Sequence, residues 1–186
     1  MNIKDKAHEY AKKAHDGQVR KDGKDYISHP EEVASILEEN GAKDYLVAAG
    51  YLHDTIEDAK VDIDDLKKNF PDEVTSLVIM DSEDKSLSWE KRKENTIKKL
   101  MESNNTDLCM LVCADKLSNM RSMYHDSLII GDEIWKRFKR GKDSQKWLYG
   151  NLLSAIKSIS DLKMYQELED LYKKLFLKEI DNGNQN

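Results

Sequence analysis

Very few residues in this chain can stop a helix, because it has only 2 prolines and 8 glycines in 186 residues. Sandwiches and barrels need frequent turns, and turns depend on glycine and proline. Apolar residues instead recur at helical spacing along the whole sequence, and no stretch shows the alternation of a strand. The sequence therefore predicts an all-α fold, a single bundle of helices with short connections.

The helix boundaries follow from the apolar spacing and from the few breakers. The expected helices cover residues 3–16, 30–41, 44–59, 62–69, 71–80, 89–103, 107–124, 144–160 and 162–180. Residues 125–143 are expected to be irregular, and the tail DNGNQN is expected to fray. The length fits one domain, which we expect to fill residues 1–186, with its core over about 4–160 and a final helix at 162–180.

Composition limits the partners and the location. The formal net charge is −6, whereas a general nucleic-acid binder is normally basic, so we expect no nucleic-acid partner. No apolar run approaches the ~18–20 residues of a membrane span, and the N-terminus lacks the apolar core of a signal peptide. Cys109 and Cys113 lie on one face of an apolar helical stretch and are expected to be buried free thiols. We therefore expect a cytoplasmic protein with no membrane partner.

The segment LHDTIED, on the expected helix 44–59, concentrates ionisable side chains. His53 and Asp54 are adjacent and can present both side chains to one cation, while Glu57 and Asp58 follow one helical turn later. A solvated surface helix could carry the same acids. The histidine favours a functional site.

A second acidic position directly follows an apolar stretch. Asp115 comes after residues 108–114, and Asn119 and Ser122 continue a polar stripe at i+4 and i+7 on an otherwise buried helix. Aspartate is almost never fully buried unless it is paired or bound to a metal. A structural salt bridge to a neighbouring cation explains Asp115 as well as a ligand role does.

A third position, His29, precedes Pro30 in the segment YISHP. Alone, it reads as a helix cap. Together with His53, Asp54 and Asp115 it makes a set of two nitrogen and two oxygen ligands, which suits Mn²⁺, Fe²⁺ or Zn²⁺ better than Mg²⁺. Such an ion can activate a water molecule and polarise a phosphoryl group.

Four motifs in this order resemble a known family. They are HDGQVRK (15–21), YISHP (26–30), YLHDTIED (51–58) and ADKLSNM (114–120). The pattern resembles the HD superfamily of metal-dependent phosphohydrolases. Within that superfamily it is similar to the hydrolase domain of the RelA/SpoT family, especially its small alarmone hydrolases of the metazoan SpoT-homologue type. The resemblance covers about residues 4–160 and implies an HD-type helical bundle.

The resemblance implies a role for each matching position. Four match the ligands of a single Mn²⁺ ion: His29, His53, Asp54 and Asp115. Two match an acidic pair that activates or orients the attacking water: Glu57 and Asp58. Four match residues at or near the nucleotide: Arg20, Lys21, Asn119 and Ser122. The family hydrolyses the 3′-pyrophosphate of guanosine tetra- or pentaphosphate, (p)ppGpp, to GDP or GTP and pyrophosphate.

Other interpretations remain open at this stage. The chain could be an HD phosphohydrolase of another phosphorylated nucleotide, such as a deoxynucleotide or the 2′-phosphate of NADPH, or a nucleotide-binding regulator without turnover. The Arg20-Lys21 loop and Asn119 favour the alarmone, and the intact pair at 57–58 argues against the regulator. The basic stretch 136–146 is a solvated loop, a polyphosphate clamp or an RNA contact. Long relatives carry a synthetase domain after the hydrolase. We expect no synthesis here, and leave a homodimer open.

Overall fold

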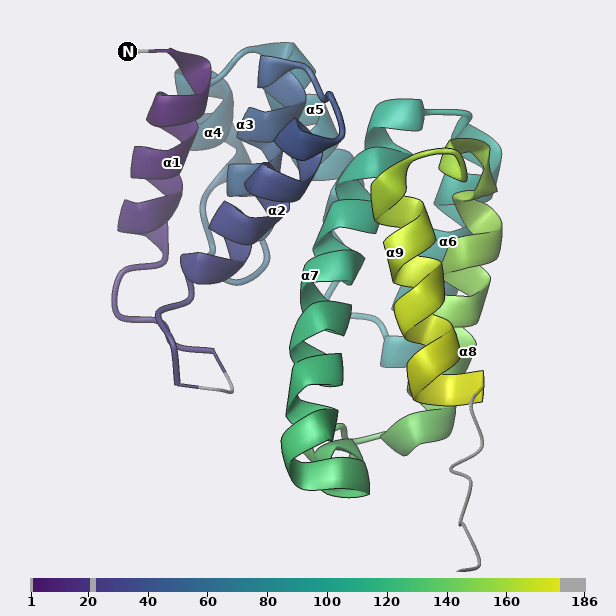
Figure 1. Cartoon of the computed structure of the whole chain (residues 1–186). Coiled ribbons are helices and arrows are strands. Elements are labelled where there is room, and N and C mark those ends of the chain that lie inside the picture. The colour runs from purple at the N-terminus through teal and green to yellow at the C-terminus, as the bar shows by residue number, and fades with distance from the viewer. Residues whose placement is uncertain (1, 21–22, 178–186) are drawn as a thin grey trace, which may run out of the picture.

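In the computed structural model, which describes residues 2–20 and 23–177, the chain is built from helices, and these residues form no strand (Figure 1). The α-helices are α1 (Ile3–Ala14), α2 (Ser28–Glu39), α3 (Asp44–Leu52), α4 (Ile63–Asn69), α5 (Asp72–Asp81), α6 (Trp89–Ser103), α7 (Thr106–Ile130), α8 (Gly141–Ala155) and α9 (Lys163–Tyr172). Shorter 3₁₀ turns are η1 (Gly131–Arg137) and η2 (Lys157–Ile159), and the π-helical turn η3 (Lys173–Leu177) extends α9. The prediction of an all-α bundle is confirmed. Lys21, the end of the helix predicted at 162–180 and the tail DNGNQN lie outside the described residues.

The N-terminal helices pack closely because α3 carries small residues where it meets its neighbours. At Gly50, a Cβ atom would lie 2.7 Å from Leu37 Cδ1 and 3.4 Å from Ala34 Cα, both on α2. A side chain at this position would collide with the Leu37 methyl group, and glycine avoids this collision. The contact fixes α2 against α3 (Figure 1), and with it the first turn of α2 against the residues that follow α3.

Helix α7 forms the middle of the molecule (Figure 1). Helices α2, α3 and α5 pack against it from one side, and α9 and η1 also contact it. Its residues 108–114 are therefore buried on every face, as the apolar sequence requires. Cys109 and Cys113 are buried free thiols, as predicted, and burial raises the pKa of Cys113 to about 12. None of the helices in 2–20 and 23–177 has the length and apolarity needed to cross a membrane.

The predicted helix 44–59 was too long, since α3 ends at Leu52 and residues 53–58 form successive turns. Side chains take over the carbonyl groups that a continuing helix would use. The Nδ1 atom of His53 lies 2.8 Å from the Gly50 carbonyl, and the Thr55 hydroxyl donates to the Leu52 carbonyl at 2.7 Å. The local bonds therefore favour turns over another helical turn.

The prediction of an irregular segment at 125–143 was also wrong. Helix α7 continues to Ile130, and η1 follows at once. No glycine or proline occurs in α7, and the first breaker is Gly131, which ends the helix with φ +57°. The absence of breakers before Gly131 was the signal for the longer helix.

The basic stretch 136–146 does not form a separate cationic surface, because acidic neighbours pair with several of its cations. Lys136 binds Glu133 at 2.6 Å, and Arg140 binds Glu90 at 2.5 Å while it lies over the Trp89 ring. Local ion pairs of this kind support an exposed, structural role for most of the stretch.

Candidate metal centre and nucleotide pocket

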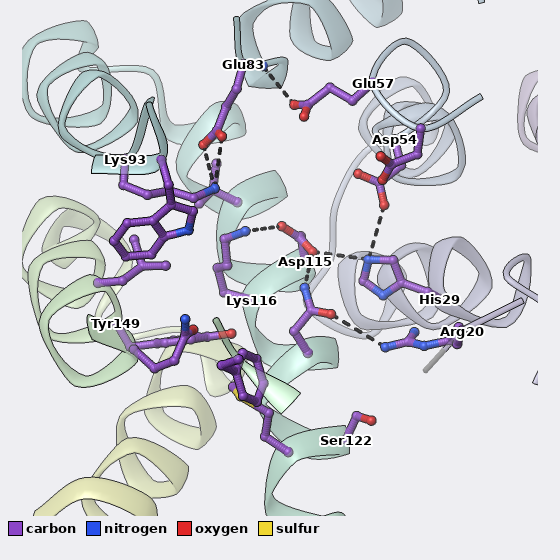
Figure 2. Close-up of a pocket in the computed structure, with 18 of the residues that line it drawn as sticks. Arg20, His29, Asp54, Glu57, Glu83, Lys93, Asp115, Lys116, Ser122 and Tyr149 are labelled. Atoms are coloured by element: carbon purple, nitrogen blue, oxygen red, sulfur yellow. Dashed lines mark hydrogen bonds and ion pairs between the residues drawn. The ribbon is translucent and has the colours of Figure 1, made fainter. Parts of the chain in front are cut away.

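Three residues from distant parts of the chain converge on one point. His29 lies in the first turn of α2, His53 follows α3, and Asp115 lies in the middle of α7. The two imidazole Nε2 atoms are 3.2 Å apart. His29 Nε2 is 3.1 Å from Asp115 Oδ1 (Figure 2). One ligand atom from each residue lies within 4.8 Å of the other two, so the three could hold a metal ion together.

Asp54 contacts the same imidazoles. Its Oδ2 atom lies 3.1 Å from His53 Nε2 and 3.5 Å from His29 Nε2. The hydroxyl of Tyr26 donates to the same Oδ2 atom at 2.6 Å and holds the carboxylate in place.

Hydrogen bonds on the far side of each ring orient the two imidazoles. His53 Nδ1 faces the Gly50 carbonyl at 2.8 Å, and His29 Nδ1 faces the Ser118 hydroxyl at 2.9 Å. Both Nε2 atoms therefore face the convergence point. Two neutral imidazoles with carboxylate oxygens form a donor set that suits Mn²⁺, Fe²⁺ or Zn²⁺.

The charges at this point depend strongly on one another. Burial alone would lower the pKa of His53, but the carboxylates of Asp54 and Asp115 raise it to about 10. Burial opposes ionisation of the two aspartates as well, yet His53 holds the pKa of Asp54, and Lys116 that of Asp115, below the usual range. The carboxylates thus attract a positive charge into a buried place, where a divalent cation can replace the proton.

The acidic pair predicted from LHDTIED lies in the turns after α3. Glu57 Oε1 accepts a hydrogen bond from the Glu83 backbone N–H at 2.7 Å, and burial raises the pKa of Glu57. Asp58 Oδ1 accepts from Lys85 at 2.7 Å, and its Oδ2 atom lies 3.0 Å from the Tyr26 hydroxyl, whose one hydrogen is directed at Asp54 by the shorter bond. Glu57 is therefore the better proton acceptor, whereas Asp58 is held by its neighbours.

A cavity of about 560 Å³ opens beside the convergence point, and both acids line it. The predicted nucleotide contacts that the structure describes line the same cavity: Arg20, Asn119 and Ser122. Arg20 Nη2 lies 3.5 Å from Asn119 Oδ1, and the Asn119 amide donates to Asp115 Oδ1 at 2.7 Å. The structure thus brings the predicted contacts to the edge of the candidate metal centre.

The opposite wall of the cavity is built by α6 and α8 together with α7 (Figure 2), and Lys93 on α6 was not predicted to belong to the site. Lys93 binds both oxygens of Glu83 at 2.8 and 2.9 Å, and Lys116 binds Asp115 at 2.7 Å. Tyr149 is buried beside them. Lysines at helical spacing look the same in a sequence whether they face water or a pocket, so only long-range packing identifies them.

Asp81, at the end of α5, also lines the cavity and was missed. Burial raises its pKa from 3.8 to about 7. A signal was present, because Asp81 directly follows the apolar run LVIM in the same way that Asp115 follows its apolar stretch.

The cavity carries no excess of positive charge. Among the described residues that line it, six are lysine or arginine and seven are aspartate or glutamate. A ligand with several phosphate groups gains little from such a balance until a divalent cation is added. The balanced charges of the cavity wall and the candidate ligands at the convergence point therefore both favour a site that binds a metal ion.

Comparisons with known proteins agree with this geometry. A family model described as an HD domain matches residues 7–129. A GTP pyrophosphokinase of Streptomyces coelicolor is 39% identical over 122 residues, which are 64% of this chain and 14% of that protein. A guanosine-3′,5′-bis(diphosphate) 3′-pyrophosphohydrolase of Aquifex aeolicus is 29% identical over 179 residues, 95% of this chain and 24% of that protein. The chain thus spans less than a quarter of the length of either relative.

Two solved structures share the fold. The crystal structure of lmo0812 from Listeria monocytogenes superposes with a TM-score of 0.76 at 36% identity, over 81% of this chain and 99% of that one. A metazoan ortholog of SpoT, described as hydrolysing ppGpp, superposes with a TM-score of 0.79 at 21% identity, over 96% and 98%. The resemblance to SpoT-type proteins seen in the sequence is confirmed, and the chain belongs to the HD-domain family.

Proposed function

We propose that the protein hydrolyses the 3′-pyrophosphate of guanosine tetra- or pentaphosphate, with one Mn²⁺ per chain held by His29, His53, Asp54 and Asp115. The observation that carries the proposal is the convergence of buried imidazole and carboxylate groups beside a cavity that has too little positive charge for a polyphosphate. The Aquifex relative is named for this activity, and the metazoan ortholog is described as having it.

The ion supplies two things when it is bound, activation of a water molecule and polarisation of a phosphoryl oxygen. The donor set present fits this ion, since it combines two imidazoles with two carboxylates. The hydrogen bonds from Gly50 and Ser118 to the Nδ1 atoms keep both Nε2 atoms directed at the ion.

Glu57 acts as the general base in this proposal, because burial raises its pKa and its carboxylate is held loosely among the described residues, by the Glu83 backbone N–H and by Lys85 at 3.9 Å. It takes the proton of the water that adds to the phosphorus next to the ribose. The bond from phosphorus to the 3′-oxygen then breaks, pyrophosphate leaves, and the 3′-oxygen is protonated to a hydroxyl. Asp58, fixed by Lys85 and Tyr26, orients the water.

The guanine nucleotide lies between the two walls of the cavity. Arg20 binds phosphate or stacks on the purine, and Asn119 and Ser122 contact the nucleoside. Lys21 is assigned to the same contacts from the sequence resemblance alone. Lys93 of the opposite wall adds a cation that a phosphate can share with Glu83.

A panel of substrates incubated with Mn²⁺ and resolved by anion-exchange chromatography tests the proposal. Release of pyrophosphate and GDP from guanosine tetraphosphate is the expected result. Rapid hydrolysis of a deoxynucleotide or of the 2′-phosphate of NADPH, with no pyrophosphate released from the alarmone, would contradict the proposed substrate. The proposal of a metal-dependent hydrolase would still stand. Incubation with GTP and ATP belongs in the panel, because some relatives are named as GTP pyrophosphokinases, and we expect no synthesis of the alarmone.

A further inference from the structure

A chain of hydrogen bonds leads from His29 through Ser118 to Glu32, one turn later on α2. His29 Nδ1 lies 2.9 Å from the hydroxyl of Ser118 on α7, and this hydroxyl lies 2.7 Å from Glu32 Oε2. The other oxygen of Glu32 accepts from Arg121 Nη1 at 3.1 Å. Ser118 is fully buried, so no water competes for its hydroxyl.

The chemistry of the three groups fixes the direction of the bonds. An ionised carboxylate can only accept, so the single hydroxyl hydrogen of Ser118 points to Glu32. The Ser118 oxygen is then left to accept, and His29 Nδ1 must donate to it. A neutral imidazole with its hydrogen on Nδ1 has its lone pair on Nε2, the atom that faces Asp115.

We propose that Ser118 and Glu32 are positioning residues for metal binding, which hold His29 in the orientation and tautomer that offer Nε2 to the ion. This inference rests on the proposed metal centre. His53 achieves the same result with the main-chain carbonyl of Gly50, which no substitution can delete. The orientation of His29 depends on the side chains of Ser118 and Glu32. These can be removed by substitution while His29, the proposed ligand, stays in place.

The far end of the chain of bonds is anchored on α9. Arg121 Nε and Nη2 bind the two oxygens of Glu167 at 2.7 and 2.8 Å, a bidentate arrangement that fixes the guanidinium. Glu167 lies beyond residues 7–129, the part that the HD-domain model matches. Helix α9 is thereby connected through Arg121, Glu32 and Ser118 to a proposed metal ligand.

Titration calorimetry of the metal-free protein with MnCl₂ tests the inference without any assay of catalysis. Ser118→Ala should weaken Mn²⁺ binding by about 10- to 100-fold, the usual cost of losing a group that orients a metal-bound histidine. Ser35→Ala is the matched control, because Ser35 also donates to a carboxylate, Glu39 at 3.0 Å, but lies exposed on α2. It should bind Mn²⁺ like the unaltered protein.

Urea unfolding in EDTA separates positioning from stability. An affinity for Mn²⁺ that is unchanged in Ser118→Ala would overturn the inference, even if the substitution lowers the urea midpoint of unfolding. If Ser118→Ala does not fold, Glu32→Ala decides in its place, since Glu32 is only partly buried and alanine leaves no acceptor for the Ser118 hydroxyl. Its affinity should fall in the same direction, and an unchanged value would overturn the inference. Failure of the unaltered protein to bind Mn²⁺ would instead overturn the metal centre, and this inference with it.

Discussion

The two walls of the cavity use opposite chemistries (Figure 2). The wall built by α2 and the turns after α3 presents imidazoles and carboxylates, each fixed by a bond to a neighbour such as Tyr26 or the Gly50 carbonyl. The wall built by α6 and α8 presents lysine, arginine and aromatic side chains. Helix α7 contributes residues to both walls. Asp115 contacts His29 of the first wall, and the next residue, Lys116, lies on the other side of the Asp115 carboxylate.

This difference indicates that the two walls have different roles in the proposed reaction. The imidazoles of the first wall are buried, and its carboxylates are held by hydrogen bonds, which suits chemistry that tolerates little displacement. Cations of the second wall are paired with acids, as Lys93 is with Glu83, so a phosphate has to compete for them. Changes in the first wall should therefore affect metal binding and kcat, and changes at the cationic positions should affect KM.

The largest effect is expected from removing a metal ligand. Asp54→Ala should lose Mn²⁺ and reduce kcat to background, a loss beyond the ~10⁴-fold upper end for one acid–base group. Metal analysis of the purified protein together with steady-state kinetics measures both. Asp64→Ala on α4, an exposed aspartate away from the cavity, is the control and should behave like the unaltered protein. Full activity without Asp54 would remove it from the ligand set.

A smaller effect is expected from the acid–base pair. Glu57→Gln keeps the shape of the side chain and removes the base, so kcat should fall by ~10²–10⁴-fold. Asp58→Asn should also lower kcat. Metal content should be unchanged in both, because neither residue is proposed as a ligand. Loss of metal on either substitution would show that the acidic pair binds the ion directly.

At the cationic positions, Arg20→Ala should raise KM for guanosine tetraphosphate. Losing a charged contact to phosphate costs about 1.5–3 kcal/mol, roughly 10- to 150-fold in kcat/KM. The penalty should shrink at high salt, since the contact is electrostatic. Lys136→Ala is the control for loss of a cation, because Lys136 is exposed and binds Glu133, and neither residue lines the cavity. A fall in kcat at constant KM would contradict the proposed role of Arg20 in substrate binding.

The smallest effect concerns stability and its dependence on pH. In the metal-free protein, burial raises the pKa of Asp81 from 3.8 to about 7. Between pH 3.8 and pH 7, the folded chain therefore keeps a proton on Asp81 that the unfolded chain has lost. Stability therefore falls as the pH rises through this window, and stays reduced above it. Asp81→Asn removes this cost. We expect a gain of about 1–2 kcal/mol at pH 8, limited because Asp81 is half-buried, and a smaller gain at pH 5.

Urea unfolding in EDTA at the two pH values checks this prediction. Asp64→Asn, an exposed aspartate on α4, supplies the control and should give the same small change at both. An equal gain from Asp81→Asn at pH 5 and pH 8 would show that the ionised Asp81 carboxylate costs nothing.

Most helices and the candidate ligands could be predicted because their signals are local. A histidine before a proline, a His-Asp pair and an aspartate after an apolar run each stand out within a few residues. The end of α3 could not be predicted, since it depends on bonds that His53 and Thr55 make to carbonyls behind them. The apolar periodicity of the sequence continues through that turn.

The second wall was beyond prediction for a different reason. Lys93 becomes a pocket residue only because α6 packs against α8 and faces α7 across the cavity. Ser118 likewise carries no signal of its own, because its partners His29 and Glu32 come from another helix. Sequence patterns describe which residues share a face of a helix, but not which distant face they meet.

The candidate ligands come from α2, from the turn after α3 and from α7, segments that lie far apart along the chain. An unfolded chain cannot gather them, so a cation held by all of them binds the native state alone. By mass action, a free ion concentration 100 times its Kd would add about 2.7 kcal/mol to the free energy of unfolding. If the proposed ion is bound there, its supply sets the stability of the fold as well as the rate of hydrolysis.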